Sequence, residues 1–218
     1  MAIYRVVCHP WLRFFMPLWT RLYRTLIPLL ALGAIVAQAY ETIVVKHGSA
    51  ANFFSYFTIH SNLLAAAVLS WAAWRLGSAS AALDVLRGAA TLYLSITGVV
   101  YSLLLAEEEA RLQLIIPWVD VVLHRVTPLV MIFDWLIHPP APPPVRRHAL
   151  LWMIYPLTFM GYTVVRGPLV GWYPYPFLNP ARVGGGLGVA AYCAGITLVA
   201  LLFAWVVVMV GRRKARAG

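Results

Sequence analysis

The sequence predicts an all-α fold, a single membrane domain over residues 1–218 built as a bundle of six transmembrane helices. The composition is the first observation behind this prediction. Of the 218 residues, 62% are hydrophobic and 11% are charged, whereas soluble domains carry about 45–50% apolar and about 25% charged residues. The mean hydropathy is +0.79. These values argue against a soluble enzyme, a disordered chain and a nucleic-acid-binding domain.

Six apolar stretches are the second observation, since a helix needs about 17–25 residues to cross a bilayer. The expected spans are residues 25–45, 53–74, 85–106, 115–137, 149–165 and 186–210. The loop after the fourth span holds five prolines between positions 139 and 144, and proline cannot continue a helix. The loop after the fifth span, residues 166–180, is rich in aromatic residues and proline. It suits either an interfacial anchor or a lid.

The placement of positive charge is the third observation, and it predicts the orientation. The net charge is +10, and Lys and Arg are concentrated before the first span and at residues 212–216. Cytoplasmic segments carry the excess of these residues. We therefore expect both termini inside the cell, in the inner (cytoplasmic) membrane of a bacterium. Such basic ends contact anionic lipid, and no nucleic-acid partner is expected.

The fourth span is unusually polar. It contains Asp120, His124, Arg125 and Asp134, and ionisable residues within a span generally face the bundle interior or a cavity. Asp120 and His124 are four residues apart, so they share a helix face and can hydrogen-bond. Pro128 has no N–H to donate to the carbonyl of His124, which leaves that carbonyl open to another partner.

Asp134 lies near the cytoplasmic end of the same span. We expect it to form a structural ion pair there, and its possible partners are Arg75, Arg87 and Arg146.

The second span carries a polar stripe formed by Ser55, Thr58 and Asn62, which lie on one helix face. Thr58 and His124 fall at similar depths, both in the outer half of the membrane. A hydroxyl, an imidazole and an acid one turn away form the set that nucleophilic catalysis requires. The same Ser and Thr residues also suit plain helix–helix contacts.

Two other interpretations remain open at this stage. His60 and His124 are potential axial haem ligands, although a di-haem protein needs four histidines within its spans. Glu41, Asp120, His124 and Arg125 are a potential proton or ion pathway, although inverted repeats are absent from the sequence. The two cysteines are far apart and form no CxxC motif, so no metal or cofactor is expected.

Three segments resemble a known family. They are FTIHSNLL in the second span, DVVLHRVTPLVMIFDWLI in the fourth, and YPLTFMGYTVVRGPLVGWYPYPFLNP in and after the fifth. The chain resembles the prokaryotic Pr6Pr membrane proteins from about Arg24 to about Val210. These are distantly similar to the FAR-17a/androgen-induced-gene proteins of animals, which are intramembrane threonine hydrolases of fatty-acid esters of hydroxy fatty acids.

The resemblance implies a lipid-ester hydrolase with Thr58 as nucleophile and His124 as base. Asp120 as the orienting acid comes instead from its spacing to His124. We expect Asn62 or Arg166 to stabilise the oxyanion, with Ser55 and Met131 also contacting a lipid or fatty-acyl ester substrate. The alternative is a non-enzymatic lipid-binding or small transport protein that uses the same cavity. The sequence does not predict the oligomeric state.

Overall fold

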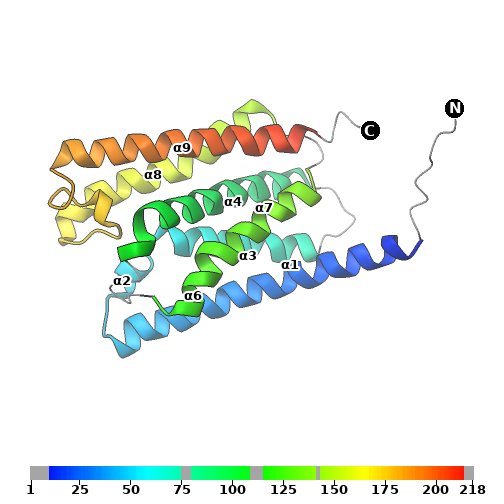
Figure 1. The fold of residues 1–218 in the computed structure, drawn as a ribbon, viewed down its shortest axis with the longest axis horizontal. Helices are drawn as coiled ribbons and strands as arrows, with labels where there is room; N and C mark the ends of the chain where they lie inside the picture. The colour runs from blue at the N-terminus through cyan, green and yellow to red at the C-terminus, as the bar shows by residue number, and fades with distance from the viewer. Residues whose placement is uncertain (1–9, 75–79, 109–114, 141–142, 214–218) are drawn as a thin grey trace.

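The chain folds into a bundle of long helices (Figure 1). The structure, a computed structural model, describes residues 10–74, 80–108, 115–140 and 143–213, with side chains described from Leu18 onward. Within these residues there are helices and no strands. In chain order the elements are α1 (Pro10–Ala39), η1 (Tyr40–Val45), α2 (Ala50–Phe53), α3 (Phe57–Trp74), α4 (Ala81–Val100), η2 (Tyr101–Leu105), α6 (Pro117–Val121), η3 (Val122–Val126), α7 (Thr127–Ile137), α8 (Arg146–Val170), η4 (Pro176–Leu178) and α9 (Gly186–Arg213).

The helices form three tiers. Figure 1 shows α8 and α9 along one side, α1 along the opposite side, and α3, α4 and α7 between them. Helix α4 is central, since it contacts α3, α7, α8 and α9. The first residues of α1 and the last residues of α9 lie at the same end of the bundle. This end is called the terminal end below, and the other is called the loop end.

Four helical segments are long and apolar enough to cross a membrane: Leu18–Val45, Ala81–Glu108, Arg146–Val170 and Gly186–Arg213. The outer faces of α1, α8 and α9 expose large apolar side chains such as Leu29, Leu169 and Leu202. A soluble monomer rarely exposes apolar surface on this scale, so the chain has the character of a membrane protein. The other two expected spans, α3 and the rod α6–η3–α7, carry the polar residues described below.

The rod α6–η3–α7 widens into a π-helix over residues 122–126, immediately before Pro128. Because Pro128 has no N–H, the His124 carbonyl loses its normal helical partner, and π-bulges often form where the hydrogen-bond ladder is disturbed. The Thr127 hydroxyl donates to the Val122 carbonyl at 3.0 Å. Helix α4 approaches closely at Gly98, where a Cβ would lie 3.4 Å from the His124 carbonyl oxygen. The π-helix thus places His124 against α4.

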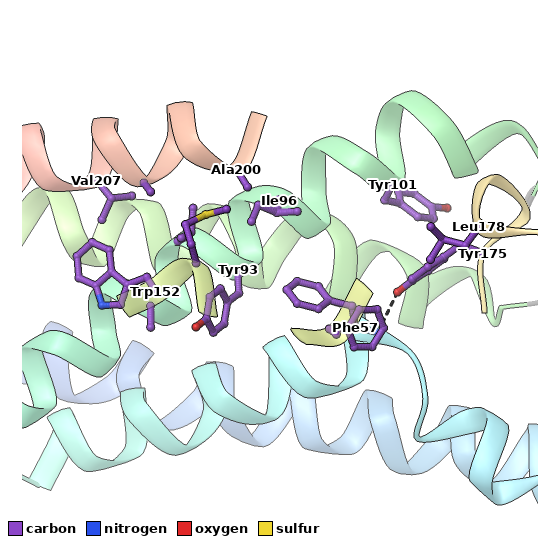
Figure 2. Packing of buried hydrophobic residues seen from close by; sticks show 14 of the residues in the cluster. Phe57, Tyr93, Ile96, Tyr101, Trp152, Tyr175, Leu178, Ala200 and Val207 are labelled. Carbon is purple, nitrogen blue, oxygen red and sulfur yellow. Dashed lines mark hydrogen bonds between the residues drawn. The ribbon is translucent and has the colours of Figure 1, made fainter. Parts of the chain in front are cut away.

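The largest buried cluster joins α4, α8, α9 and the loop after α8. Figure 2 shows Trp152 and Val207 at one end of it and Tyr101, Tyr175 and Leu178 at the other. The indole N–H of Trp152 donates to the Val85 carbonyl at 2.9 Å. The ring of Trp152 also lies where a side chain at position 88 would be, which only glycine permits. The core therefore holds α8 against α4 along its length.

A buried charge cluster fixes the terminal end. Asp134, with no exposed side-chain surface, pairs with Arg24 at 2.7 Å and with Arg87 at 2.7 Å. It also accepts a hydrogen bond from the Tyr23 hydroxyl at 2.5 Å. The expected ion pair of Asp134 is therefore present, with Arg87 as one of the partners foreseen. Arg24 was not foreseen as a partner, and Arg75 lies outside the described residues.

Candidate active site

Thr58, His124 and Asp120 form a hydrogen-bonded chain at the loop end of the bundle. The Thr58 hydroxyl lies 3.3 Å from Nε2 of His124, and Nδ1 of His124 lies 2.8 Å from Oδ1 of Asp120. A carboxylate only accepts hydrogen bonds, so it fixes the proton of the ring on Nδ1. Nε2 then presents its lone pair to Thr58. The contact expected between the second and fourth spans is present.

Two helix starts and one π-helix supply these three side chains. Thr58 lies in the first turn of α3, and Asp120 lies in α6, which begins at Pro117. His124 lies in η3 and is 5% exposed, whereas Thr58 is half-buried. The Asp120 side chain is 16% exposed, so the acid, like Thr58, is partly accessible, whereas His124 is buried.

Tyr101 packs against one face of the His124 imidazole. Its ring stacks on that of His124, with centroids 3.8 Å apart and an interplanar angle of 11°. Its side chain also hydrogen-bonds to Asp120. Arg125 approaches the second oxygen of Asp120 at 3.8 Å. The His124 ring is therefore fixed by two hydrogen bonds and one stacked ring, which limits its rotation.

Asn62 joins α3 to η3 rather than facing the Thr58 cavity. Its side-chain NH₂ donates to the Thr58 carbonyl at 2.9 Å and to the Leu123 carbonyl at 3.1 Å. Both amide hydrogens are used in this way. Its Oδ1 is buried and has no hydrogen-bond partner among the described residues. Asn62 thus positions the two helices that carry Thr58 and His124.

Tyr175 closes the other side of Thr58. It comes from the loop between α8 and α9, and its hydroxyl oxygen accepts from the backbone N–H of Phe57 at 2.9 Å (Figure 2). Tyr175 and Thr58 line the same cavity, and Phe57 directly precedes Thr58, so the phenol lies next to the nucleophile. Burial raises the pKa of Tyr175, which keeps its phenol protonated at neutral pH.

Thr58 opens onto an apolar cavity. The cavity has a volume of about 60 Å³, which is small beside the ~300–1,000 Å³ typical of small-molecule sites. Its polar lining residues include Thr58, Thr97, Tyr101 and Tyr175, and apolar side chains of α4, α8, α9 and η4 form the rest. The apolar lining suits a short hydrocarbon segment with one reactive polar group beside Thr58, and a longer acyl chain has to extend beyond this cavity.

A second, polar pocket reaches the same site from its other side. Its lining includes Glu41, Lys46, Tyr101, Asp120 and Arg125. Tyr101 lines both this pocket and the apolar cavity. The His124–Asp120 pair therefore lies between an apolar space and a charged one, so water can approach it without crossing the apolar cavity.

Three of the predicted site residues lie elsewhere. Ser55 donates to the Ala51 carbonyl at 2.7 Å. Arg166 donates to Oδ1 of Asn52 at 2.7 Å, and its guanidinium lies over the ring of Trp172. Met131 is fully buried and packs in a cluster with the apolar residues Ala65, Leu69, Ala90 and Leu94. None of the three is among the residues that line the apolar cavity, so the structure separates them from Thr58.

The haem interpretation conflicts with the hydrogen bonds of both histidines. Nε2 of His60 is bonded to the Phe54 carbonyl at 2.7 Å, and Nδ1 is bonded to the Tyr155 hydroxyl at 2.6 Å. Both ring nitrogens of His124 are also engaged, so neither histidine presents a free nitrogen to iron. No group of three or more His, Cys, Asp or Glu side chains placed to hold a metal ion occurs in the described part of the chain.

Tyr101 and Tyr175 are the site residues that the sequence interpretation missed as such. Each tyrosine contacts the Thr58–His124–Asp120 group from a different element, so residue spacing within one span does not predict that these tyrosines belong to the site. One signal was available for Tyr101, because its position near the outer end of the third span matches the depth of His124. No family model, curated protein or solved structure matches this chain.

Proposed function

We propose that the protein is an intramembrane hydrolase of lipid esters, with Thr58 as nucleophile, His124 as general base and Asp120 as the orienting acid. The observation that carries this proposal is the hydrogen-bonded chain Thr58–His124–Asp120 at the wall of an apolar cavity. A threonine hydroxyl is a weak nucleophile at neutral pH unless an adjacent base activates it. A base at 3.3 Å, held by an acid, meets that requirement.

In the proposed reaction, Oγ1 of Thr58 attacks the ester carbonyl carbon while its proton passes to Nε2 of His124. The tetrahedral intermediate then expels the alcohol oxygen, which leaves with that proton. Water from the polar pocket attacks the acyl–Thr58 ester, with His124 again as base, and the acid is released. The Asp120 carboxylate stabilises the imidazolium that forms in each half of the reaction.

We further propose that all six helical passages cross the inner membrane, with both termini in the cytoplasm. The resemblance to the Pr6Pr proteins that we infer from three segments implies this topology, and their distant resemblance to the FAR-17a/androgen-induced-gene proteins, which rests on six spans, a Thr and a His, implies an ester substrate. The distribution of basic residues also supports it. In this orientation, the chain of three residues lies toward the outer leaflet.

A fluorophosphonate probe tests the nucleophile in the purified full-length protein, because it phosphonylates activated hydroxyls. We expect covalent labelling of the wild type at Thr58 and loss of labelling in Thr58→Ala and His124→Ala. Thr97→Ala is the matched control: Thr97 lines the same cavity, but its hydroxyl is bonded to Ser61 at 3.1 Å and not to His124. Labelling that persists in Thr58→Ala would contradict the assignment.

Transport is the rival function that one observation favours, since Glu41, Asp120 and Arg125 line one polar pocket. From His124 toward the terminal end of the bundle, however, no ionisable residue occurs between Arg125 and Asp134. The cluster around Met131 fills much of that layer with buried apolar side chains, and the Thr91 hydroxyl beside it is uncharged and bonded to the Arg87 carbonyl. A proton or ion pathway generally uses ionisable groups within the membrane, so the lack of one in this stretch favours hydrolysis over transport.

A further inference from the structure

An ester hydrolase needs a hydrogen-bond donor for the oxyanion of its tetrahedral intermediate, and the two donors expected from the sequence do not supply it. Both amide hydrogens of Asn62 are bonded to carbonyl oxygens. Arg166 is held by Asn52 and Trp172, away from the cavity. The donor has to be sought among the polar groups next to Thr58.

The Tyr175 hydroxyl is the group in that position. Its oxygen accepts from the backbone N–H of Phe57 at 2.9 Å, and Phe57 directly precedes Thr58. Tyr175 and Thr58 also line the same cavity. Because the Phe57 N–H occupies the phenol oxygen as an acceptor, the phenol proton remains available to donate beside Oγ1 of Thr58, the atom that attacks the substrate.

The surroundings strengthen this donor. The Phe57 N–H that bonds to the phenol oxygen belongs to the first turn of α3, where helical N–H groups have no partners within the helix. Hydrogen bonds in a chain polarise one another, so this N–H makes the phenol proton a better donor. The partial positive charge at the start of a helix also favours a developing negative charge beside it.

We propose that Tyr175 is a further catalytic residue, which donates its phenol proton in a hydrogen bond to the oxyanion formed when Thr58 attacks an ester. This inference rests on the proposed hydrolase function. As Oγ1 bonds to the carbonyl carbon, the C=O electron pair moves to the oxygen, which then lies next to Oγ1. The Tyr175 hydroxyl turns to this oxygen, keeps its proton covalently, and turns back when the C=O bond re-forms.

This exchange gives rate acceleration rather than tighter substrate binding. In the resting protein the polar groups beside the phenol, the Phe57 N–H and the Thr58 hydroxyl, are neutral, whereas in the transition state the phenol bonds to an anion. Hydrogen bonds to charged groups are about twice as strong as neutral ones. An interaction that strengthens only in the transition state raises kcat and leaves KM nearly unchanged. A tyrosine that merely caps α3 has no such effect.

The test compares kcat and KM of Tyr175→Phe and of the wild type, both in detergent micelles, on an ester whose acyl chain is water-soluble. We expect kcat to fall about 10²–10³-fold, the range for loss of one oxyanion donor, with KM changed little. The matched control is Tyr155→Phe: Tyr155 stacks on Phe57 in the same aromatic cluster, but its hydroxyl bonds to His60. We expect Tyr155→Phe to keep near-normal kcat.

A second measurement does not depend on the folded fraction of the variant. The ratio of kcat for an ester to kcat for the matching thionoester is an internal quantity, because both reactions occur in one sample. Sulfur accepts hydrogen bonds weakly, so losing the donor should slow the ester much more than the thionoester. We expect the ratio to fall in Tyr175→Phe and to stay constant in Tyr155→Phe.

The outcomes separate the two proposals. An unchanged ester-to-thionoester ratio in Tyr175→Phe, with hydrolysis still dependent on Thr58, overturns the role of Tyr175 and leaves the hydrolase function standing. A thermal stability loss with unchanged kcat of the folded protein identifies a helix cap and also overturns that role. A wild type that hydrolyses no ester and binds no fluorophosphonate overturns both.

Discussion

At the residue scale, two carboxylates of one helical rod illustrate how surroundings assign roles. The Asp134 side chain has no exposed surface and forms ion pairs with two arginines. Asp120 is partly exposed to a polar pocket and bonds to an imidazole. Asp134, which has two permanent counter-ions, holds helices together. Asp120, which bonds to an imidazole, stabilises a positive charge that forms on that ring only during the reaction.

Asp120→Asn tests the catalytic side of this contrast. An amide at position 120 can donate to Nδ1, which favours the tautomer that carries its proton on Nε2 and blocks attack by Thr58. We expect turnover of a model lipid ester to fall about 10³–10⁴-fold, with a melting temperature near that of the wild type in detergent. A lower melting temperature with normal specific activity of the folded fraction would remove Asp120 from the mechanism.

Asp134→Asn tests the structural side. It leaves Arg24 and Arg87 buried without their shared counter-charge, and removing one partner of a buried ion pair costs about 3–5 kcal/mol. We expect a marked drop in thermal stability in detergent, with normal kcat for the protein that remains folded. Asp84→Asn is the matched control, because Asp84 pairs with the same guanidinium but its side chain is 17% exposed, whereas that of Asp134 has no exposed surface, and it should lower stability less.

The residue scale also shows what the sequence could predict. Helical spacing predicted the contact of Asp120 with His124, and matching depth predicted the contact of Thr58 with His124, because both relations follow from residue spacing along a helix. Arg166 was misplaced because depth alone does not say which neighbour a side chain turns to. Tyr175 was missed as a site residue because its place depends on how a loop folds back.

At the element scale, that loop is shaped by glycines and prolines. Gly171 ends α8 in the left-handed region at φ 64°, which a side chain would strain. The chain then returns across α8 so closely that a Cβ at Gly167 would overlap the ring of Tyr173. The loop between α8 and α9 thereby lies close to the start of α3, where Tyr175 meets Phe57 and Thr58.

An ion pair of Arg182 with Glu108 at 2.6 Å joins the same loop to the end of the third span.

Gly167→Ala tests whether this close approach positions the site. The added methyl must displace the Tyr173 ring, and we expect Tyr175 to shift with it and ester turnover to fall at least tenfold. Gly161→Ala is the control on the same helix, because its Cβ would meet nothing within 4 Å. Replacing glycine by alanine there should be neutral or stabilising by up to about 1 kcal/mol. Equal activity of both variants would contradict the role given to Gly167.

The helix bounds could be predicted only in part, for reasons that belong to this scale. The apolar pattern places the fifth span at residues 149–165, whereas α8 runs from Arg146 to Val170. Helices continue past the hydrocarbon core into the polar interface, and the helical turns that lie there are too polar to be detected from hydropathy. The π-helices of the third and fourth spans were not foreseen either, because a π-bulge leaves no separate mark on an apolar pattern.

At the scale of the whole molecule, the number of helices that cross the membrane depends on α3 and the rod α6–η3–α7. By length and composition alone, four segments of the described residues qualify as spans. Helix α3 has 18 residues and so rises about 27 Å at 1.5 Å per residue, close to the ~30 Å hydrocarbon core. It lies between α1 and α4, and the rod α6–η3–α7 lies against α4 (Figure 1). Their polar side chains face one another there rather than lipid, which is how polar spans are normally accommodated.

The two topologies differ most sharply at the end of the third span. Both put the chain termini on the same side, so a reporter at the C-terminus does not separate them. With six spans, Glu108 faces the periplasm; if α3 and α6–η3–α7 do not cross, it faces the cytoplasm. Alkaline phosphatase is active only where its disulfides form, in the periplasm.

We therefore expect alkaline phosphatase inserted after Glu108 of the full-length chain to be active. The same insertion after Ser80 should be inactive, as should a fusion after Gly218. Inserting into the whole chain, rather than truncating it, keeps α3 and α6–η3–α7 paired with the helices that cover their polar faces. An inactive insertion after Glu108 with an active one after Ser80 establishes four spans. The Thr58–His124 pair would then have to be reached from the membrane surface, because neither of its helices would cross.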